Sequence, residues 1–133
     1  MISAQFPLHS WFLVIGGAIF AVAFALPILL APLTWARLFR WQLPANTELT
    51  VYFGRCVGAL GLAVVAVGFI AAPHPEQHVI LFDLLIAVGG GLTAVHVWGA
   101  VERSQPWTET AEIAMYLGLT IAAVLLRRLL GGL

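Results

Sequence analysis

Apolar residues follow one another in four long runs, and short polar segments separate these runs. The runs cover residues 11–30, 51–71, 79–100 and about 111–130. Each run is close to the ~20 residues with which an α-helix crosses a hydrocarbon core about 30 Å thick. The runs are continuously apolar, whereas a membrane β-barrel strand alternates apolar and polar residues. The pattern therefore predicts an all-α membrane protein, an antiparallel bundle of four transmembrane helices that forms a single domain over residues 1–133.

The composition strengthens this interpretation. Hydrophobic residues make up 62% of the 133 residues, charged residues make up 9%, and the mean hydropathy is +1.01. These values exclude a soluble domain of ordinary composition. The formal net charge is zero, so we expect no nucleic-acid partner. The chain has no lysine, and its permanently charged basic side chains are six arginines. Cys56 is the single cysteine, which excludes an internal disulfide and a CxxC motif.

The segment between the first two runs carries aromatic and basic residues at helical spacing. Residues 32–42 predict a short interfacial helix in the headgroup region, with Trp35, Leu38 and Phe39 toward lipid. Asn46 or Thr47 is expected to cap the second transmembrane helix. Tryptophan and arginine side chains anchor membrane proteins at the interface. The expected interfacial anchors are Trp35, Arg37, Arg40, Trp41 and Trp107.

Four helices place both chain ends on one side of the membrane, the terminal face, and the first and third connections on the other side, the loop face. The loop face carries Arg37, Arg40 and Arg103, and the terminal face carries Arg127 and Arg128. By the positive-inside rule this excess favours a cytoplasmic loop face. Residues 1–10 contain no lysine or arginine, so we expect the first run to stay in the mature protein. The predicted location is the bacterial inner membrane.

Several polar residues lie inside the predicted helices near the loop face. Arg55 is the clearest case, because a charged residue inside a membrane helix is costly and needs a partner. We expect Arg55 to pair with Glu112 or Glu48 and to lock the bundle, with His96 and the tyrosines completing the network. Helical periodicity and depth in the membrane bring together Glu48, Tyr52, Arg55, His96, Glu112 and Tyr116.

Other interpretations of the polar residues remain open. The Arg55 cluster could form a pocket for an anionic lipid headgroup, a quinone or a small substrate. His96 could instead be an axial ligand of haem or of the magnesium in a chlorophyll-type pigment. On the terminal face, His74 and His78 are weak metal-ligand candidates, because Pro75 separates them. Asp83 lies inside the third helix and needs a donor. The candidate donors are His78, Arg127 and Arg128.

Small residues recur within the second apolar run. Gly54, Gly58 and Gly61 are spaced so that they share part of one helix surface. Small residues let backbones approach closely at helix contacts in membranes. We interpret these glycines as packing positions inside the bundle, with oligomerisation or partner docking as the alternative.

The layout resembles the DoxX-like families of small four-helix membrane proteins. The resemblance rests on Ala31 and Pro32 at the exit from the first helix, on the Tyr52-Phe53-Gly54-Arg55 sequence near the start of the second, and on Gly58. With the four-segment layout it covers nearly the whole chain. It implies association with membrane redox systems in some members and no assigned activity in most. It carries no functional residue over to this chain.

No catalytic motif is present, so we do not expect an enzyme, and the sequence requires no resident cofactor. We predict a non-catalytic accessory or structural subunit of a larger membrane complex, respiratory or photosynthetic, in contact with membrane lipids and other subunits. The first alternative is a small carrier or a lipid- or quinone-binding protein that uses the Arg55 cluster. The second alternative is a redox protein with a histidine-ligated cofactor.

Overall fold

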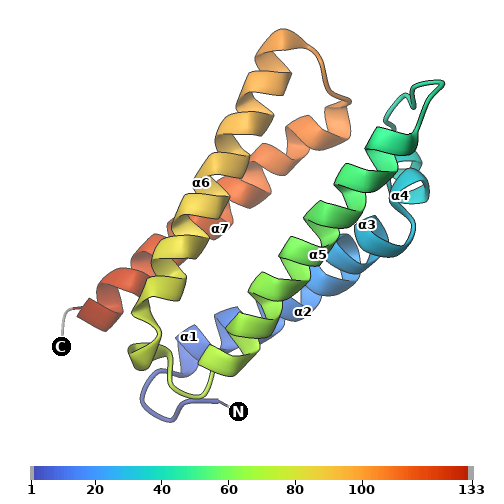
Figure 1. Ribbon diagram of the computed structural model, residues 1–133. Helices are drawn as coiled ribbons and strands as arrows, with labels where there is room; N and C mark the ends of the chain where they lie inside the picture. Colours follow the sequence, from blue (N-terminus) through green and yellow to red (C-terminus); the bar gives the residue numbers. More distant parts are fainter. Residues whose placement is uncertain (1, 132–133) are drawn as a thin grey trace. The chain divides into compact units, whose positions relative to one another are not determined.

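Helices make up nearly all of the regular structure in the computed structural model, which describes residues 2–131 (Figure 1). No strand occurs within that range. The contacts between residues divide the chain into two compact units, Met1–Pro75 and Glu76–Leu133, and each unit is a helical hairpin. The all-α class predicted from the sequence is confirmed. The joining of both hairpins into one antiparallel four-helix bundle stays a prediction.

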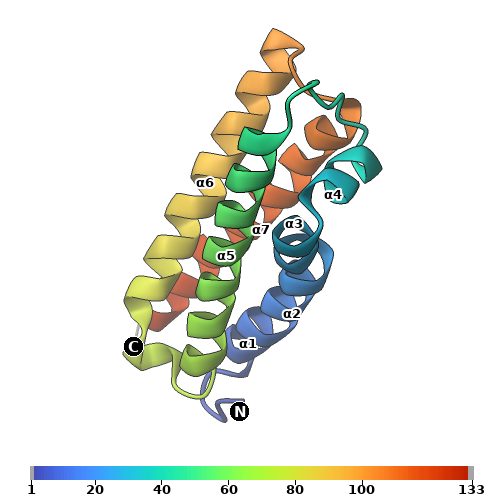
Figure 2. The same ribbon diagram turned by 45° about the vertical axis from the view of Figure 1, so that its right-hand side comes forward.

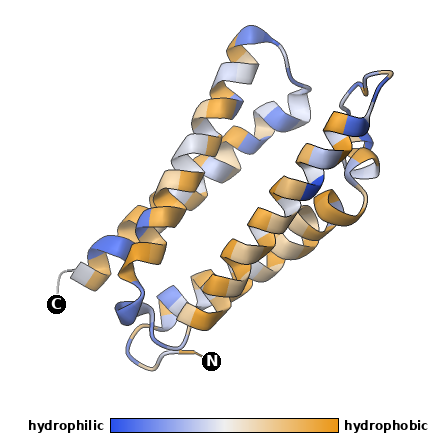
Figure 3. Cartoon of the chain, in the orientation of Figure 1, coloured by the Kyte–Doolittle hydropathy of each residue, from blue (hydrophilic) through white to orange (hydrophobic). Residues whose placement is uncertain are grey.

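Within the described residues, four helices are long and apolar enough to cross a membrane, which supports a multi-pass membrane protein. Their mean hydropathies lie between 1.8 and 2.6, and Figure 3 shows apolar residues along each of them. The helices extend beyond the predicted apolar runs at several ends, because polar residues near the ends continue the helical hydrogen bonding. The four spans are Pro7–Leu30, Glu48–Ala71, Val79–Glu102 and Trp107–Gly131.

The first span combines α-helical and π-helical turns. In chain order its pieces are α1 (Pro7–Trp11), η1 (Phe12–Gly16), α2 (Gly17–Phe20), η2 (Ala21–Ala25) and α3 (Leu26–Leu30). Pro27 has no N–H group, so it cannot donate to the carbonyl of Ala23, four residues earlier. The indole Nε1 of Trp35 donates to that carbonyl instead, at 3.3 Å. A side chain from the next helix thus compensates for the proline.

A short helix, α4 (Pro32–Leu38), follows the first span. It ends before the predicted limit of residue 42, because the backbone turns into the left-handed region at Arg40, where φ is 67°. The placement of this helix at the membrane interface stays a prediction.

The aromatic residues of α4 are turned toward the first span. The rings of Trp35 and Phe39 stack with their centroids 4.3 Å apart, and Phe24 of η2 contacts both rings. The amphipathic pattern predicts lipid contact for Trp35 and Phe39, and the hydrogen bond to Ala23 and the ring contacts place both half-buried side chains against the first span. Leu38 is the one residue of the predicted lipid-facing set that is largely exposed, at 75%.

The helix α5 (Glu48–Ala71) begins at a side-chain cap. The backbone N–H of Glu48 donates to Oδ1 of Asn46 at 3.0 Å. Asn46 was one of two residues expected in this role, and Thr47 makes no such side-chain bond. The cap satisfies one of the unpaired donors at the start of the helix.

Glycines bring α5 against the first span. A Cβ atom at Gly58 would lie 2.6 Å from the backbone nitrogen of Leu29 and 2.7 Å from the carbonyl oxygen of Ala25. The other two glycines of the predicted set are also close to neighbouring elements, Gly54 to Pro32 and Gly61 to Phe20. Because only a residue without a side chain fits at Gly58, this contact fixes the spacing of the two helices.

Buried serines close the terminal end of the N-terminal hairpin. Ser10 is fully buried, and its hydroxyl donates to the carbonyl of Ala72. The same oxygen accepts a hydrogen bond from the backbone N–H of Ser3 at 2.9 Å. The residues before α1 are thereby joined to the end of α5.

The C-terminal hairpin consists of α6 (Val79–Glu102) and α7 (Trp107–Gly131), preceded by the 3₁₀ turn η3 (Pro75–Gln77). The two helices lie side by side in both views (Figure 1 and Figure 2). A side chain at Gly89 would collide with Thr120, so the glycine permits close packing. Towards the terminal face, Nε of Arg127 donates to Asp83 at 2.8 Å. Arg127 is one of the three donors expected for Asp83.

Candidate metal centre

His96 lies on α6, about two turns before the end of the helix, and is 8% exposed. Its Nδ1 atom is 2.7 Å from the carbonyl oxygen of Leu92, one turn earlier. A carbonyl oxygen can only accept, so Nδ1 carries the proton of this hydrogen bond. In the neutral imidazole the other nitrogen, Nε2, then has a free lone pair. This lone pair is available to a proton or to a metal ion.

Two carboxylates from the start of α7 face this nitrogen. Nε2 of His96 is 3.2 Å from Oε2 of Glu109 and 3.6 Å from Oε2 of Glu112. The two glutamates are three residues apart, so they share one side of α7. Both lie near the N-terminus of a long helix, where the helix dipole favours negative charge.

The loop between α6 and α7 fixes the two helices in this register. Arg103 adopts the left-handed conformation that ends α6, with φ of 55°, and the N–H of Ser104 donates to the carbonyl of Gly99 at 3.0 Å. The side chain of Gln105 then folds back, and its Nε2 donates to the carbonyl of His96 at 2.9 Å and to Oγ1 of Thr110 at 3.2 Å. Gln105 therefore ties the turn of α6 that holds His96 to the first turns of α7.

The cluster is buried. The exposed fractions are 6% for Glu109 and 8% for Glu112, and Oε1 of Glu112 accepts no hydrogen bond from any residue in the range 2–131. The ring of Tyr116 lies against His96 with a centroid distance of 4.8 Å, and its hydroxyl interacts with Glu112. Burial without a donor is costly for this one oxygen, so a further positive or donating group beside Oε1 of Glu112 would be favourable.

The three ligand atoms have the spacing of a metal site. They all lie within 4.8 Å of one another. Zinc binds nitrogen and oxygen ligands at 2.0–2.2 Å, and tetrahedral geometry then separates neighbouring ligand atoms by about 3.3 Å. The distances from His96 to the two glutamates, 3.2 Å and 3.6 Å, agree with that separation. The Leu92 carbonyl supplies the second-shell bond that orients metal-ligating histidines.

The structure brings together part of the residue set predicted from the sequence. His96, Glu112 and Tyr116 meet in the C-terminal hairpin. Glu109 was not part of the predicted site, although its position one turn before Glu112 was the available signal. Gln105 and the Leu92 carbonyl were not predicted, because the loop geometry that uses them is not visible in the residue pattern.

The other members of the predicted set belong to the N-terminal hairpin. Glu48, Tyr52 and Arg55 are all exposed on α5. Within the described part of that hairpin, no ion pair joins Arg55 to Glu48, which lies seven residues away on the helix. The predicted pairing of Arg55 with Glu112 stays a prediction, since the two residues lie in separate units.

His74 and His78, the metal candidates of the terminal face, immediately precede and follow η3 in the chain. Among the described residues, the group of histidine and carboxylate ligands with metal-like spacing consists of His96, Glu109 and Glu112. The better metal candidate is therefore the His96 cluster near the loop between α6 and α7, and not the pair His74 and His78.

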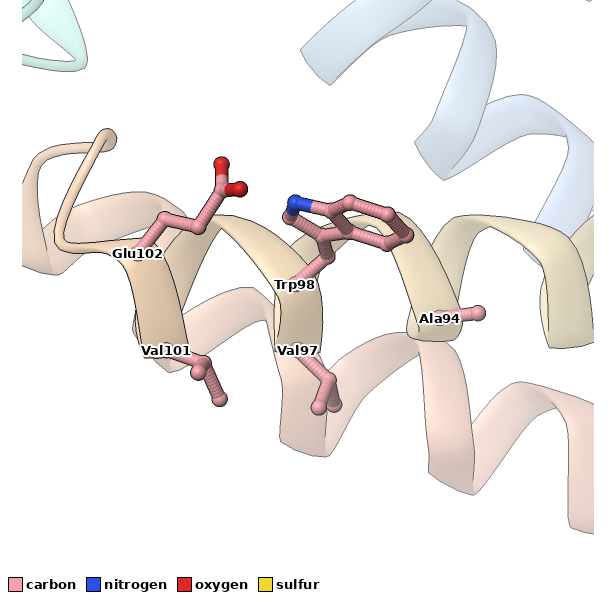
Figure 4. Close-up of a pocket in the computed structure, with 5 residues that line it drawn as sticks. All are labelled: Ala94, Val97, Trp98, Val101 and Glu102. Carbon is pink, nitrogen blue, oxygen red and sulfur yellow. The ribbon is translucent and has the colours of Figure 1, made fainter.

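A hollow on the surface of α6 is lined mainly by apolar side chains. Figure 4 shows Trp98 and Glu102 projecting to one side of the helix, with Val97 and Val101 on another. All residues that line the hollow come from this one helix, and Trp98 and Val101 are 68% and 78% exposed. One carboxylate beside apolar side chains does not make a metal or catalytic site.

No family model, no curated protein and no solved structure matches this chain. The resemblance to DoxX-like proteins therefore stays a prediction.

Proposed function

We propose that this multi-pass membrane protein binds a divalent transition-metal ion, with Zn²⁺ as the best-fitting ion, through His96, Glu109 and Glu112. One observation carries the proposal. Nδ1 of His96 is already committed to the Leu92 carbonyl, and the remaining nitrogen faces two buried carboxylates at 3.2 Å and 3.6 Å. A cation between these three groups satisfies all of them at once.

A proton alone fits the cluster less well. A proton shared between His96 and Glu109 would satisfy those two groups and would leave Oε1 of Glu112 buried without a donor from the described residues. A buried ion pair also repays its desolvation only when its remaining lone pairs are satisfied. A divalent ion compensates two carboxylate charges and leaves a coordination position for water or for the Tyr116 hydroxyl.

The ligand types narrow the class of ion. One imidazole and two carboxylates suit zinc, manganese or ferrous iron, whereas Cu(I) prefers thiolates and thioethers. Calcium takes six to eight oxygen ligands, more than this site offers. Haem or a chlorophyll-type pigment would need an open face at His96, and Glu109 and Glu112 occupy the space in front of Nε2.

The metal would connect α6 to α7 near the loop face, which is the predicted cytoplasmic side of a bacterial inner membrane. Such an ion stabilises the hairpin in the way structural zinc sites contribute to folding. This role is compatible with an accessory subunit of a larger membrane complex, and it requires no turnover.

The test is metal binding by the whole protein in lipid nanodiscs. After treatment with a chelator, titration with Zn²⁺ is expected to give one bound ion per chain by calorimetry and elemental analysis. His96→Gln and Glu112→Gln should each weaken binding about tenfold or more, because each removes one of three ligands. Glu102→Gln is the matched control, since Glu102 is exposed at the same end of α6 and lies outside the cluster.

Cobalt gives a second readout, because bound Co²⁺ reports tetrahedral coordination in its visible absorption. The site variants should lose this absorption and the control should keep it. Equal Zn²⁺ affinity in the parent, the site variants and Glu102→Gln would disprove the proposal.

A further inference from the structure

Arg55 lies inside the second membrane span. It follows Glu48, the first residue of α5, by seven residues, which is about 10 Å along the helix axis. Its side chain is exposed on the N-terminal hairpin. Its neighbour Gly54 faces Pro32, and Gly58 faces Leu29. The guanidinium group is therefore not used in the packing of α5 against the first span.

Residues 2–75 of the N-terminal hairpin form no ion pair with this charge. Glu48 is the single acidic residue in positions 1–75, and it forms no ion pair with Arg55 in the described part of the hairpin. The same hairpin carries Arg37 and Arg40, so three arginines against one glutamate give it a net charge of +2. All four charged residues lie towards the loop face.

An arginine side chain stays protonated and cannot lower its cost in the membrane by losing its charge. Within a turn or two of the helix end, a long side chain extends along the helix until its charged group reaches the headgroup region. The strongest partner there is a phosphate oxygen pair, which matches the planar guanidinium fork in a bidentate arrangement. Tyr52, one turn closer to the surface and 63% exposed, adds a hydroxyl donor on the same face.

We propose that Arg55 holds the phosphate group of an anionic phospholipid against the loop-face end of the N-terminal hairpin. The positive charge of this hairpin selects an anionic lipid over a zwitterionic lipid, although both contain a phosphate. The proposal is independent of the metal site, which belongs to the other hairpin.

The experiment measures which lipid stays with the purified protein. The full chain is purified in mild detergent with equal amounts of phosphatidylglycerol and phosphatidylcholine, and the bound lipids are counted by native mass spectrometry. The parent protein should retain phosphatidylglycerol preferentially. Arg55→Gln should lower that retention about fivefold, the size expected for one arginine at an anionic headgroup. Arg103→Gln, which removes an exposed loop-face arginine of the other hairpin, should leave it unchanged.

Two further arms separate the alternatives. Inorganic phosphate at millimolar concentration should not displace the lipid, and displacement would overturn the lipid assignment in favour of a free-phosphate site. Equal retention by the parent and Arg55→Gln would overturn the proposal and would favour a protein carboxylate as the partner of Arg55. If Arg55→Gln does not fold, the parent protein still decides, because a parent without preference for phosphatidylglycerol contradicts the proposal.

Discussion

The indole nitrogen of Trp35 lies 3.3 Å from the carbonyl oxygen of Ala23, the acceptor that Pro27 leaves without its usual helical donor. The first membrane span thus depends on a side chain from α4 for one of its backbone hydrogen bonds. In a membrane this matters more than in water, because lipid offers no alternative donor.

Replacing Trp35 by phenylalanine tests this relationship. Trp35→Phe keeps an aromatic ring for the stack with Phe39 and removes the Nε1 donor. We expect the free energy of unfolding in detergent to fall by about 1 kcal/mol, the usual net value of one hydrogen bond. Trp98→Phe, at an exposed position of α6, should change it by less than about 0.5 kcal/mol. Equal effects of the two substitutions would contradict the prediction.

The close helix contact at Gly58 leads to a second prediction about stability. A methyl group at this position would meet the backbone of Leu29 and Ala25 at 2.6–2.8 Å, and backbone atoms cannot move aside as a flexible side chain can. We expect Gly58→Ala to destabilise the protein by about 1–3 kcal/mol, seen as a lower midpoint of thermal unfolding. Gly118→Ala is the control, since nothing lies within 4 Å of the added atom. A Gly58→Ala protein as stable as this control would show that the two helices can separate without cost.

Gln105 should influence the metal site without touching the metal. Gln105→Glu keeps the size of the side chain and removes the amide donor to the carbonyl of His96. We expect Zn²⁺ affinity to fall about tenfold, the lower end of the effect seen for second-shell groups. Gln77→Glu makes the same chemical change at an exposed position at the other end of the hairpin and should leave the affinity unchanged. Calorimetric titration in nanodiscs measures the Zn²⁺ affinity of both variants. Unchanged affinity in Gln105→Glu would show that the hydrogen bond of Gln105 does not hold the site in place.

The sequence predicts the helices well because the thickness of the bilayer sets their length. A continuous apolar run of about 20 residues has few other structures available to it. Single interactions were also predictable where only a few partners exist, as for the Asn46 cap at the start of α5 and for Asp83, whose few candidate donors included Arg127 on α7.

Side-chain partners across helices were harder to predict. The sequence predicts one depth in the membrane for Arg55, His96 and Glu112, but depth says nothing about the rotation of a helix about its axis. The turn at Arg103 and the Gln105 bridge set the rotation of α7, and this rotation gives His96 the partner Glu109. The hydrogen bond of Trp35 was not predicted for a related reason. The amphipathic pattern takes no account of the carbonyl acceptor that Pro27 leaves open on the neighbouring helix.

The bond between Ser10 and the Ala72 carbonyl has a consequence for how the N-terminal hairpin is closed. Together with the bond from Ser3 to Ser10, it connects the two ends of the N-terminal hairpin, and the three residues of these two bonds all lie within positions 3–72. Both hydrogen bonds are therefore made within the N-terminal hairpin and use no residue of α6 or α7. The first helical pair therefore has its closing hydrogen bonds without any contribution from the second pair.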